Sequence, residues 1–112
     1  MRPIPEKIKK QINKDPFYNV CCITGSTGVS IEHAQIYAGK QISDLWALVP
    51  LRRDLNTSHP PKEVKDKCKL ISLERAKAMG EWDNIKKKYP KKDWDQEYNF
   101  LIKTYGKPKR SW

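Results

Sequence analysis

The sequence predicts an α+β fold in a single small domain, residues 1–112. A length of 112 residues is typical of one domain. Apolar residues recur at helical spacing near the amino terminus and through the carboxyl-terminal half, while β-branched and aromatic residues alternate with glycine turns over residues 17–51. These patterns predict an N-terminal helix, a β-hairpin, a short helix and two longer C-terminal helices, in that order.

The first predicted element is a lysine-rich helix over residues 5–14. Ile4, Ile8 and Ile12 recur at helical spacing, and the helix-breaking pair Asp15-Pro16 follows them. We expect this helix to pack one narrow apolar stripe against the rest of the domain.

The β-hairpin is predicted between Phe17 and Leu51. Its apolar segments include VSIEHAQIY at residues 29–37 and LWALVPL at residues 45–51, and glycines at positions 25, 28 and 39 suit the turns. The segment RRDLNTSH, residues 52–59, then has room for one or two helical turns before Pro60 and Pro61 interrupt it.

Two longer helices are predicted after the hairpin. The first begins at Pro61, which suits an initial helical position, and extends to about Tyr89, with Gly80 as a weak point. The second begins at Asp93, a capping residue, and ends near Gly106. Aromatic side chains at helical spacing are expected to be core residues rather than base-stacking residues. They are Trp82, Trp94, Tyr98 and Tyr105.

The charge balance favours a polyanionic partner. The chain has 23 Lys and Arg residues against 13 Asp and Glu residues, which gives a net charge of +10 at pH 7. A basic surface of this kind attracts nucleic acid. The lysines are spread through most segments, however, and lysine-rich surfaces also keep small proteins soluble.

The composition argues against several other classes of protein. The longest apolar run, residues 45–51, is too short to cross a bilayer, and the first ten residues lack the apolar stretch of a signal peptide, so no membrane partner is expected. Cys21, Cys22 and Cys68 form no C-x-x-C pair, and we therefore expect neither a disulfide framework nor a structural zinc ion. The expected location is a reducing compartment, the cytoplasm.

A carboxylate stands next to one of the two histidines, in the segment SIEHAQIY. Glu32 and His33 both lie on the predicted first strand of the hairpin. Adjacent strand residues point to opposite faces. The two side chains can therefore share a site only if the strand bends or bulges there, as strands often do beside active sites.

The stretch IEHAQIYAGKQISDLWALVPLRRDLN, residues 31–56, resembles the ββα-metal core of HNH endonucleases. In that family a carboxylate or histidine precedes the catalytic histidine on the first strand, a loop leads to a second strand, and a helix then delivers the last metal ligand. The spacing is similar to that of phage-encoded HNH recombination nucleases and of the HNH domain of CRISPR nucleases. The resemblance implies a small ββα-metal core over about residues 17–60 with a basic, helical extension over about residues 61–112, in a protein encoded by a phage or a bacterium.

The resemblance assigns roles to individual residues. It makes His33 the general base, Glu32 a metal ligand and Asn56 the last metal ligand, with His59 as a substitute ligand or phosphate contact. One Mg²⁺ or Mn²⁺ is the expected cofactor because carboxylate and amide oxygens suit these ions. An imidazole that titrates near neutrality can accept a proton from water. DNA is the implied substrate, with RNA as an alternative partner.

Other basic residues are candidate phosphate contacts. Arg53 is expected to hold a phosphate beside the metal and so to take part in catalysis, and Arg52 is expected to bind the nucleic acid next to it. Lys40, in the loop of the hairpin, and Lys87 and Lys88, in a later lysine run, are further candidates. The alternatives are a salt bridge within the loop for Lys40 and simple solvation for the others.

Ala47 takes the place of the middle asparagine of the HNH pattern. Alanine has no side chain that forms hydrogen bonds, so either a backbone carbonyl positions His33 or catalysis is impaired. Two functions therefore remain open for the ββα scaffold: a metal-dependent endonuclease, and a DNA-binding or architectural protein that retains the scaffold without turnover. A third possibility is a basic protein that binds RNA or a ribonucleoprotein.

Overall fold

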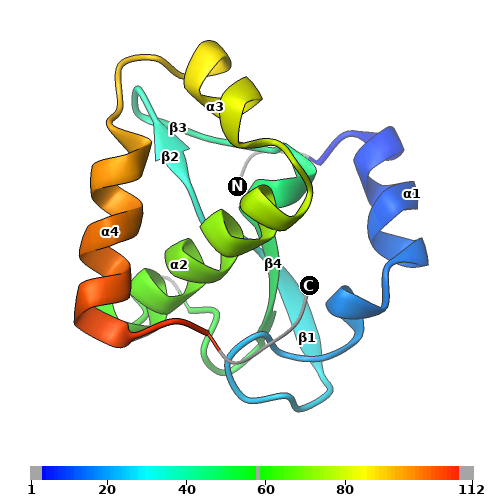
Figure 1. Ribbon diagram of the computed structural model, residues 1–112. Helices are drawn as coiled ribbons and strands as arrows, with labels where there is room; N and C mark the ends of the chain where they lie inside the picture. The colour runs from blue at the N-terminus through cyan, green and yellow to red at the C-terminus, as the bar shows by residue number, and fades with distance from the viewer. Residues whose placement is uncertain (1–3, 58, 109–112) are drawn as a thin grey trace.

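The computed structural model describes residues 4–57 and 59–108 of the chain. Within those residues the fold is α+β, with four α-helices and two small antiparallel sheets (Figure 1). The elements are α1 (Glu6–Lys14), the 3₁₀ helix η1 (Pro16–Asn19), β1 (Val29–His33), β2 (Ile36–Tyr37), β3 (Lys40–Gln41), the 3₁₀ helix η2 (Leu45–Ala47), β4 (Leu48–Arg52), α2 (Lys62–Ala78), α3 (Trp82–Lys88) and α4 (Trp94–Tyr105). In the described part of the chain, no helix has the length and apolar character that a membrane span requires.

The main sheet pairs β1 with β4 in antiparallel order. Val29 lies opposite Arg52 and His33 lies opposite Leu48. One more backbone hydrogen bond extends the ladder, because the Ala34 N–H donates to the Ala47 carbonyl at 2.9 Å. The predicted hairpin is thus confirmed as a pair of strands, although the connection between them is longer and more structured than a single turn.

That connection contains a second, smaller hairpin formed by β2 and β3. Two residues close it, Ala38 with φ 52° and Gly39 with φ 79°. Positive φ at both central positions is the geometry of the primed turn that suits the right-handed twist of a hairpin. Tyr37 anchors the hairpin to the helices, since its hydroxyl accepts a hydrogen bond from the Lys91 N–H at 2.9 Å.

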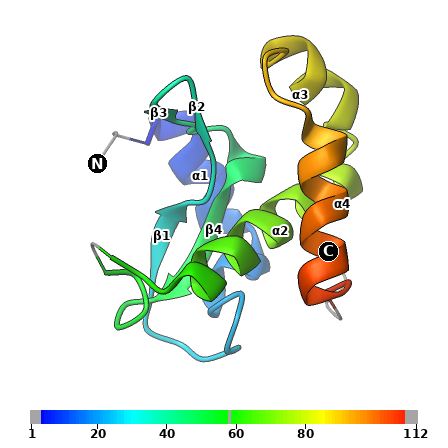
Figure 2. The same ribbon diagram turned by 90° about the vertical axis from the view of Figure 1, so that its left-hand side faces the viewer.

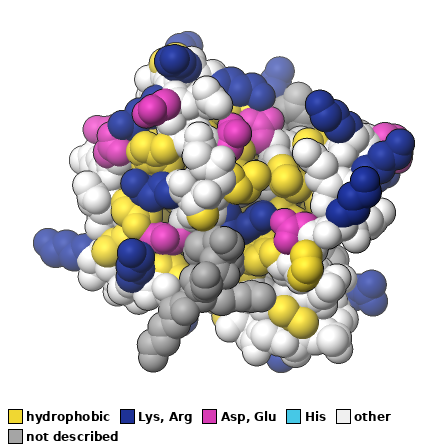
Figure 3. Space-filling model, turned by 45° about the vertical axis from the view of Figure 1, so that its right-hand side comes forward, with side chains coloured by type: hydrophobic (Ala, Val, Ile, Leu, Met, Phe, Trp, Pro, Cys, Tyr) yellow, Lys and Arg dark blue, Asp and Glu magenta, His cyan; other side chains and the backbone are white. Residues whose placement is uncertain are grey.

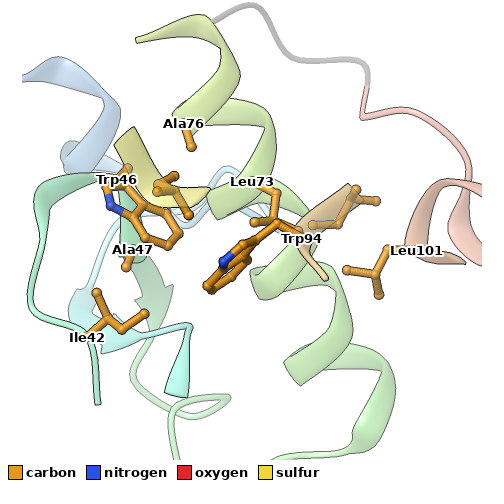
Figure 4. Packing of buried hydrophobic residues seen from close by; sticks show 9 residues of the cluster. Ile42, Trp46, Ala47, Leu73, Ala76, Trp94 and Leu101 are labelled. Atoms are coloured by element: carbon orange, nitrogen blue, oxygen red, sulfur yellow. The ribbon is translucent and has the colours of Figure 1, made fainter. Parts of the chain in front are cut away.

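Helix α2 lies between the β1–β4 pair on one side and α4 on the other (Figure 2). A first core cluster, defined here as the helical core, joins η2, α2, α3 and α4, with Trp46, Leu73 and Trp94 among its members (Figure 4). A second cluster, defined here as the sheet core, joins α2 to the β1–β4 pair. Its buried residues are Cys21, Cys22, Ala34, Val49, Leu51, Cys68 and Ile71.

The predicted helix from Pro61 to Tyr89 is two helices in the structure, and its prediction as one element was wrong. Gly80 has φ 73°, which lies in the left-handed region where a helix ends. The Glu81 N–H donates to the Ala76 carbonyl at 2.9 Å and the Gly80 N–H donates to the Lys77 carbonyl at 3.2 Å. This pair of bonds is a Schellman motif, which ends α2 and lets α3 start in a new direction.

The predicted boundaries of the last helix are confirmed. The Asp93 side chain accepts the Gln96 N–H at 3.0 Å at the start of α4, and Gly106 follows its last residue with φ 78°. Trp94 is fully buried, and the other aromatic residues predicted to be core pack against the helical core. They also use their polar atoms within the fold, through the hydrogen bonds Trp82 to Asp95, Tyr98 to Glu74 and Tyr105 to Asp66.

Helix α1 is confirmed over Glu6–Lys14 and contacts η1 and η2 (Figure 1). Its isoleucines are only half-buried, so the helix covers the domain without entering either core. The stronger link from this end of the chain to α2 is Arg75, whose guanidinium donates to the Tyr18 hydroxyl at 2.5 Å and to the Asp15 carboxylate at 2.9 Å.

Candidate functional site

A cavity of about 570 Å³ lies between β1, the residues Asn56, Thr57 and Pro60, and the first turns of α2. Three of its lining residues are Glu32, His33 and Asn56, which the sequence alone singled out. Two lysines of α2, Lys65 and Lys69, line it as well. The structure therefore brings together one carboxylate, one imidazole, two amides (those of Asn56 and Gln41) and two ammonium groups at a single concave surface.

Glu32 reaches the cavity from the face of β1 that is covered by α2. It lies opposite Val49 in the antiparallel ladder, and directly opposed residues point to the same face. Val49 packs against Cys68 of α2 in the sheet core. Burial on this face raises the pKa of the Glu32 carboxyl, while a hydrogen bond from the His33 N–H and the positive charge of Lys65 act in the opposite direction.

Asn56 is held against the same face of the sheet. Its Nδ2 donates to the Ser30 hydroxyl at 2.7 Å, and Ser30 is two residues from Glu32, so both point toward α2. A single helical turn positions the residue, because the N–H groups of Leu55 and Asn56 both donate to the Arg52 carbonyl, at 2.9 and 3.0 Å. The amide nitrogen is used by Ser30, which leaves the amide oxygen as the cation ligand that Asn56 can offer.

His33 is the last residue of β1 and is 6% exposed. The ladder pairs one residue with one residue from Val29 to His33, so the bulge considered from the sequence is not what brings Glu32 and His33 together in the described strands. Both line the cavity because the strand ends at His33 and the chain then turns into β2. The Ala47 carbonyl fixes the backbone immediately after His33 through its bond to Ala34.

Lys65 and Lys69 were not identified from the sequence. They lie four residues apart, and so on the same side of α2, next to Val64 and Cys68, which also line the cavity. Other lysines of this helix form ion pairs, Lys62 with Asp66 and Lys67 with Glu63. Neither Lys65 nor Lys69 forms an ion pair within the described residues. Their position beside the apolar stripe of a helix was the one available signal.

The candidates near the end of β4 lie outside the cavity lining. His59 is exposed, and so is Arg53, whose N–H donates to the Gly28 carbonyl at 3.2 Å. Arg52 forms an ion pair with Asp54 at 2.5 Å, and that pair is exposed. These three residues are close in sequence to Asn56 and Pro60, which line the cavity, but they do not line it themselves.

The lysine candidates are distributed over the surface. Lys40 is exposed on β3. Asp44, the acidic residue of the same loop, forms an ion pair with Lys88 at 3.0 Å. Lys87 is exposed on α3, which follows the C-terminal end of α2. The cavity lies at the other end of α2, beside its N-terminal turns. Figure 3 shows the same pattern on one face of the molecule, where basic side chains are interspersed with acidic and hydrophobic ones.

The candidate metal ligands do not form the usual kind of metal-binding cluster, in which several His, Cys, Asp or Glu side chains converge. Within residues 4–57 and 59–108, no group of three or more His, Cys, Asp or Glu side chains is arranged to hold a metal ion. Glu32 offers a carboxylate and Asn56 an amide oxygen for that purpose, and His33 lines the same cavity.

No protein family model matches the chain, and no match is found among curated proteins or solved structures.

Proposed function

We propose that the protein is a metal-dependent endonuclease of the HNH type, which hydrolyses phosphodiester bonds of DNA. The observation that supports this most strongly is the meeting of Glu32, His33 and Asn56 at one cavity. Asn56 is 24 residues from Glu32 in the sequence, and a chance resemblance to the HNH pattern would not require the two residues to line the same cavity. The order of two antiparallel strands, β1 and β4, followed by helix α2 also supports the proposal. Helix α2 begins at Lys62, after the predicted core, and Asn56 lies in a turn because the short helix predicted within residues 52–59 is not formed in the described residues.

The donor atoms fit one hard divalent cation. The Glu32 carboxylate and the Asn56 amide oxygen are ligands that suit Mg²⁺ or Mn²⁺, and two protein ligands leave further positions for water and a substrate phosphate. A cation also compensates the burial of Glu32, which disfavours its ionised form. When bound, such a cation supplies electrostatic stabilisation of the scissile phosphate and the leaving oxygen.

The chain's own residues perform the remaining steps. The His33 imidazole accepts a proton from a water molecule, which attacks phosphorus in line with the leaving oxygen. The bond to the 3′-oxygen breaks, and the products carry 5′-phosphate and 3′-hydroxyl ends by analogy with the family. Lys65 and Lys69 attract the phosphate into the cavity, and the net charge of +10 draws the polyanion to the surface. The expected location is the cytoplasm, which contains both DNA and Mg²⁺.

Plasmid cleavage tests this function. Supercoiled DNA is incubated with the purified protein in Mg²⁺, in Mn²⁺ and in chelator, and nicked and linear products are separated by electrophoresis. The His33→Ala variant should lose about 100-fold or more of the rate, because general-base catalysis contributes that much. The His59→Ala variant is the matched control, since His59 is exposed outside the cavity lining. Equal nicking by the His33→Ala protein and the wild type would exclude the proposed role.

A second function is favoured by Ala47, whose methyl side chain is fully buried and makes no hydrogen bond. A DNA-binding or architectural protein that keeps the ββα scaffold without turnover would bind DNA in a salt-sensitive manner and in the presence of chelator. It would show no cleavage with either metal. A protein that acts on RNA would instead retain RNA in preference to DNA of the same sequence.

A further inference from the structure

Ile36 lies at the edge of the candidate cavity with 57% of its surface exposed. The neighbouring residue, Tyr37, explains this exposure. Adjacent strand residues point to opposite faces, and Tyr37 is anchored by Lys91 and by an edge-to-face contact with Tyr89 at 5.0 Å between ring centroids. With Tyr37 fixed on the inner face, the Ile36 side chain is held on the outer one.

The hairpin that holds Ile36 is short and well defined. Ile36 pairs with Gln41, which also lines the cavity, and the turn at Ala38 and Gly39 closes the strands in two residues. The Ile42 N–H donates to the Gln35 carbonyl at 2.9 Å and fixes the base of the hairpin. The apolar side chain is therefore held in place at the cavity rather than carried on a long loop.

Lys65 and Lys69 line the same cavity from α2. The cavity thus combines a fixed apolar contact on the hairpin with positive charge on the helix. A nucleotide has the matching composition, because its base has an apolar face and its phosphate is an anion. The volume of about 570 Å³ falls within the range of sites that hold one small molecule, so a single nucleotide fits while a double helix does not enter.

In a double helix the faces of the bases are covered by their stacked neighbours, and only the base edges are accessible in the grooves. An isoleucine has no hydrogen-bonding group with which to recognise those edges. It can pack on the face of a base only where that base is unpaired or unstacked.

We propose that the cavity accepts an unpaired nucleotide, with its base packed on Ile36 and its phosphate held by Lys65 and Lys69. The preferred substrates are then single-stranded or locally unpaired nucleic acids rather than continuous duplex. This inference rests on the proposed function in that the cavity is taken as the nucleic-acid site, and it adds the substrate class and the residue that selects it.

Binding in chelator tests the inference without any need for cleavage. A fluorescently labelled single-stranded oligonucleotide and a blunt duplex of the same sequence are titrated with the protein at one fixed salt concentration, and anisotropy is recorded. The wild type should bind the single strand more tightly. The Ile36→Ala variant should lose about tenfold in affinity for the single strand, the loss expected when an aliphatic side chain that packs on a base is shortened to alanine, and change little toward duplex.

Two further variants separate specific contact from general effects. Phe100→Ala is the matched control, because Phe100 is also 57% exposed but lies on α4, outside the cavity. It should leave both affinities unchanged. Ile36→Trp offers a larger surface for packing on a base and should restore or increase single-strand affinity.

Equal wild-type affinity for single strand and duplex would overturn the inference, and so would an equal loss for both ligands in the Ile36→Ala protein. In either case the cavity would remain a nucleic-acid site and the proposed nuclease function would stand. Failure of the wild type to bind either ligand in chelator would overturn the inference alone, whereas the proposed function fails if DNA is not cleaved with Mg²⁺ or Mn²⁺.

Discussion

Replacing Arg75 with methionine should lower the free energy of unfolding by about 3 kcal/mol. The Arg75 side chain is 6% exposed and donates two hydrogen bonds, to the Tyr18 hydroxyl at 2.5 Å and to the Asp15 carboxylate at 2.9 Å. Hydrogen bonds to charged groups contribute about 1.5–3 kcal/mol each. The lower end of that range applies here, because the Asp15 side chain is 33% exposed and water can replace its lost partner.

The rings around Arg75 contribute less to the expected loss. The guanidinium carbon lies 4.0 Å from the centroid of the Phe17 ring, and methionine retains much of this contact because sulfur packs well against aromatic rings. The sum of about 3 kcal/mol corresponds to a decrease of roughly 12 °C in melting temperature for a domain of this size.

Urea denaturation followed by circular dichroism measures this loss. Arg52→Met is the matched control, because Arg52 forms an exposed ion pair with Asp54 and such pairs contribute less than about 1 kcal/mol. The m-values should stay equal, so that the midpoints report stability. A loss below about 1 kcal/mol for Arg75→Met, similar to that of the control, would refute the view that Arg75 holds η1 onto α2.

Three other predictions concern the site and the hairpin. The pKa of Glu32 is raised in the folded protein, so its ionisation lowers the free energy of unfolding above the folded-state pKa, and this cost declines as the pH falls from the folded-state pKa to the lower, unfolded-state pKa. In chelator, the Glu32→Gln protein should therefore be more stable than the wild type at neutral pH, with a difference that closes in acid; a difference that grows in acid would show that the pKa is lowered. Ala38→Gly should raise the free energy of unfolding by about 0.5–1 kcal/mol, since φ 52° strains alanine but not glycine, and a loss measured by urea titration would contradict the turn geometry. The double variant Lys65→Ala and Lys69→Ala should weaken DNA binding and reduce its salt dependence by about two phosphate contacts, as measured by anisotropy at several salt concentrations; an unchanged slope would exclude contact between these lysines and phosphates.

The fold class, the first and last helices and the aromatic core could be predicted from the sequence because local signals determine them. The capping residue Asp93 and the terminal Gly106 act within a few residues of themselves. The division of the helix at Gly80 was harder to predict, since an isolated glycine is tolerated in a helix. The break between α2 and α3 lets Ile85 of α3 pack into the helical core, and this packing is a tertiary contact that the local sequence does not reveal.

The small hairpin was missed because its strands are two residues long and show no periodicity. Its turn sequence, Ala38-Gly39, also lacks the asparagine or aspartate that usually marks a primed turn. The hairpin is defined instead by the pairing of Ile36 with Gln41 and by the anchoring of Tyr37 at Lys91, a contact across 54 residues of sequence.

In the candidate site, Glu32, His33 and Asn56 were identified through the resemblance of residues 31–56 to the HNH pattern. Lys65 and Lys69 line the cavity only because α2 packs one particular side onto the sheet, and helical periodicity alone does not give that orientation.

Metal binding at the cavity tests the central claim most directly. Crystals of the wild-type protein grown with Mn²⁺, measured at a wavelength where manganese scatters anomalously, should show one peak in contact with the Glu32 carboxylate and the Asn56 amide oxygen, near His33. A doubly substituted Glu32→Gln and Asn56→Ala protein should lack that peak under the same conditions. A wild-type crystal with no manganese in this cavity, at a Mn²⁺ concentration that supports cleavage in solution, would contradict the account.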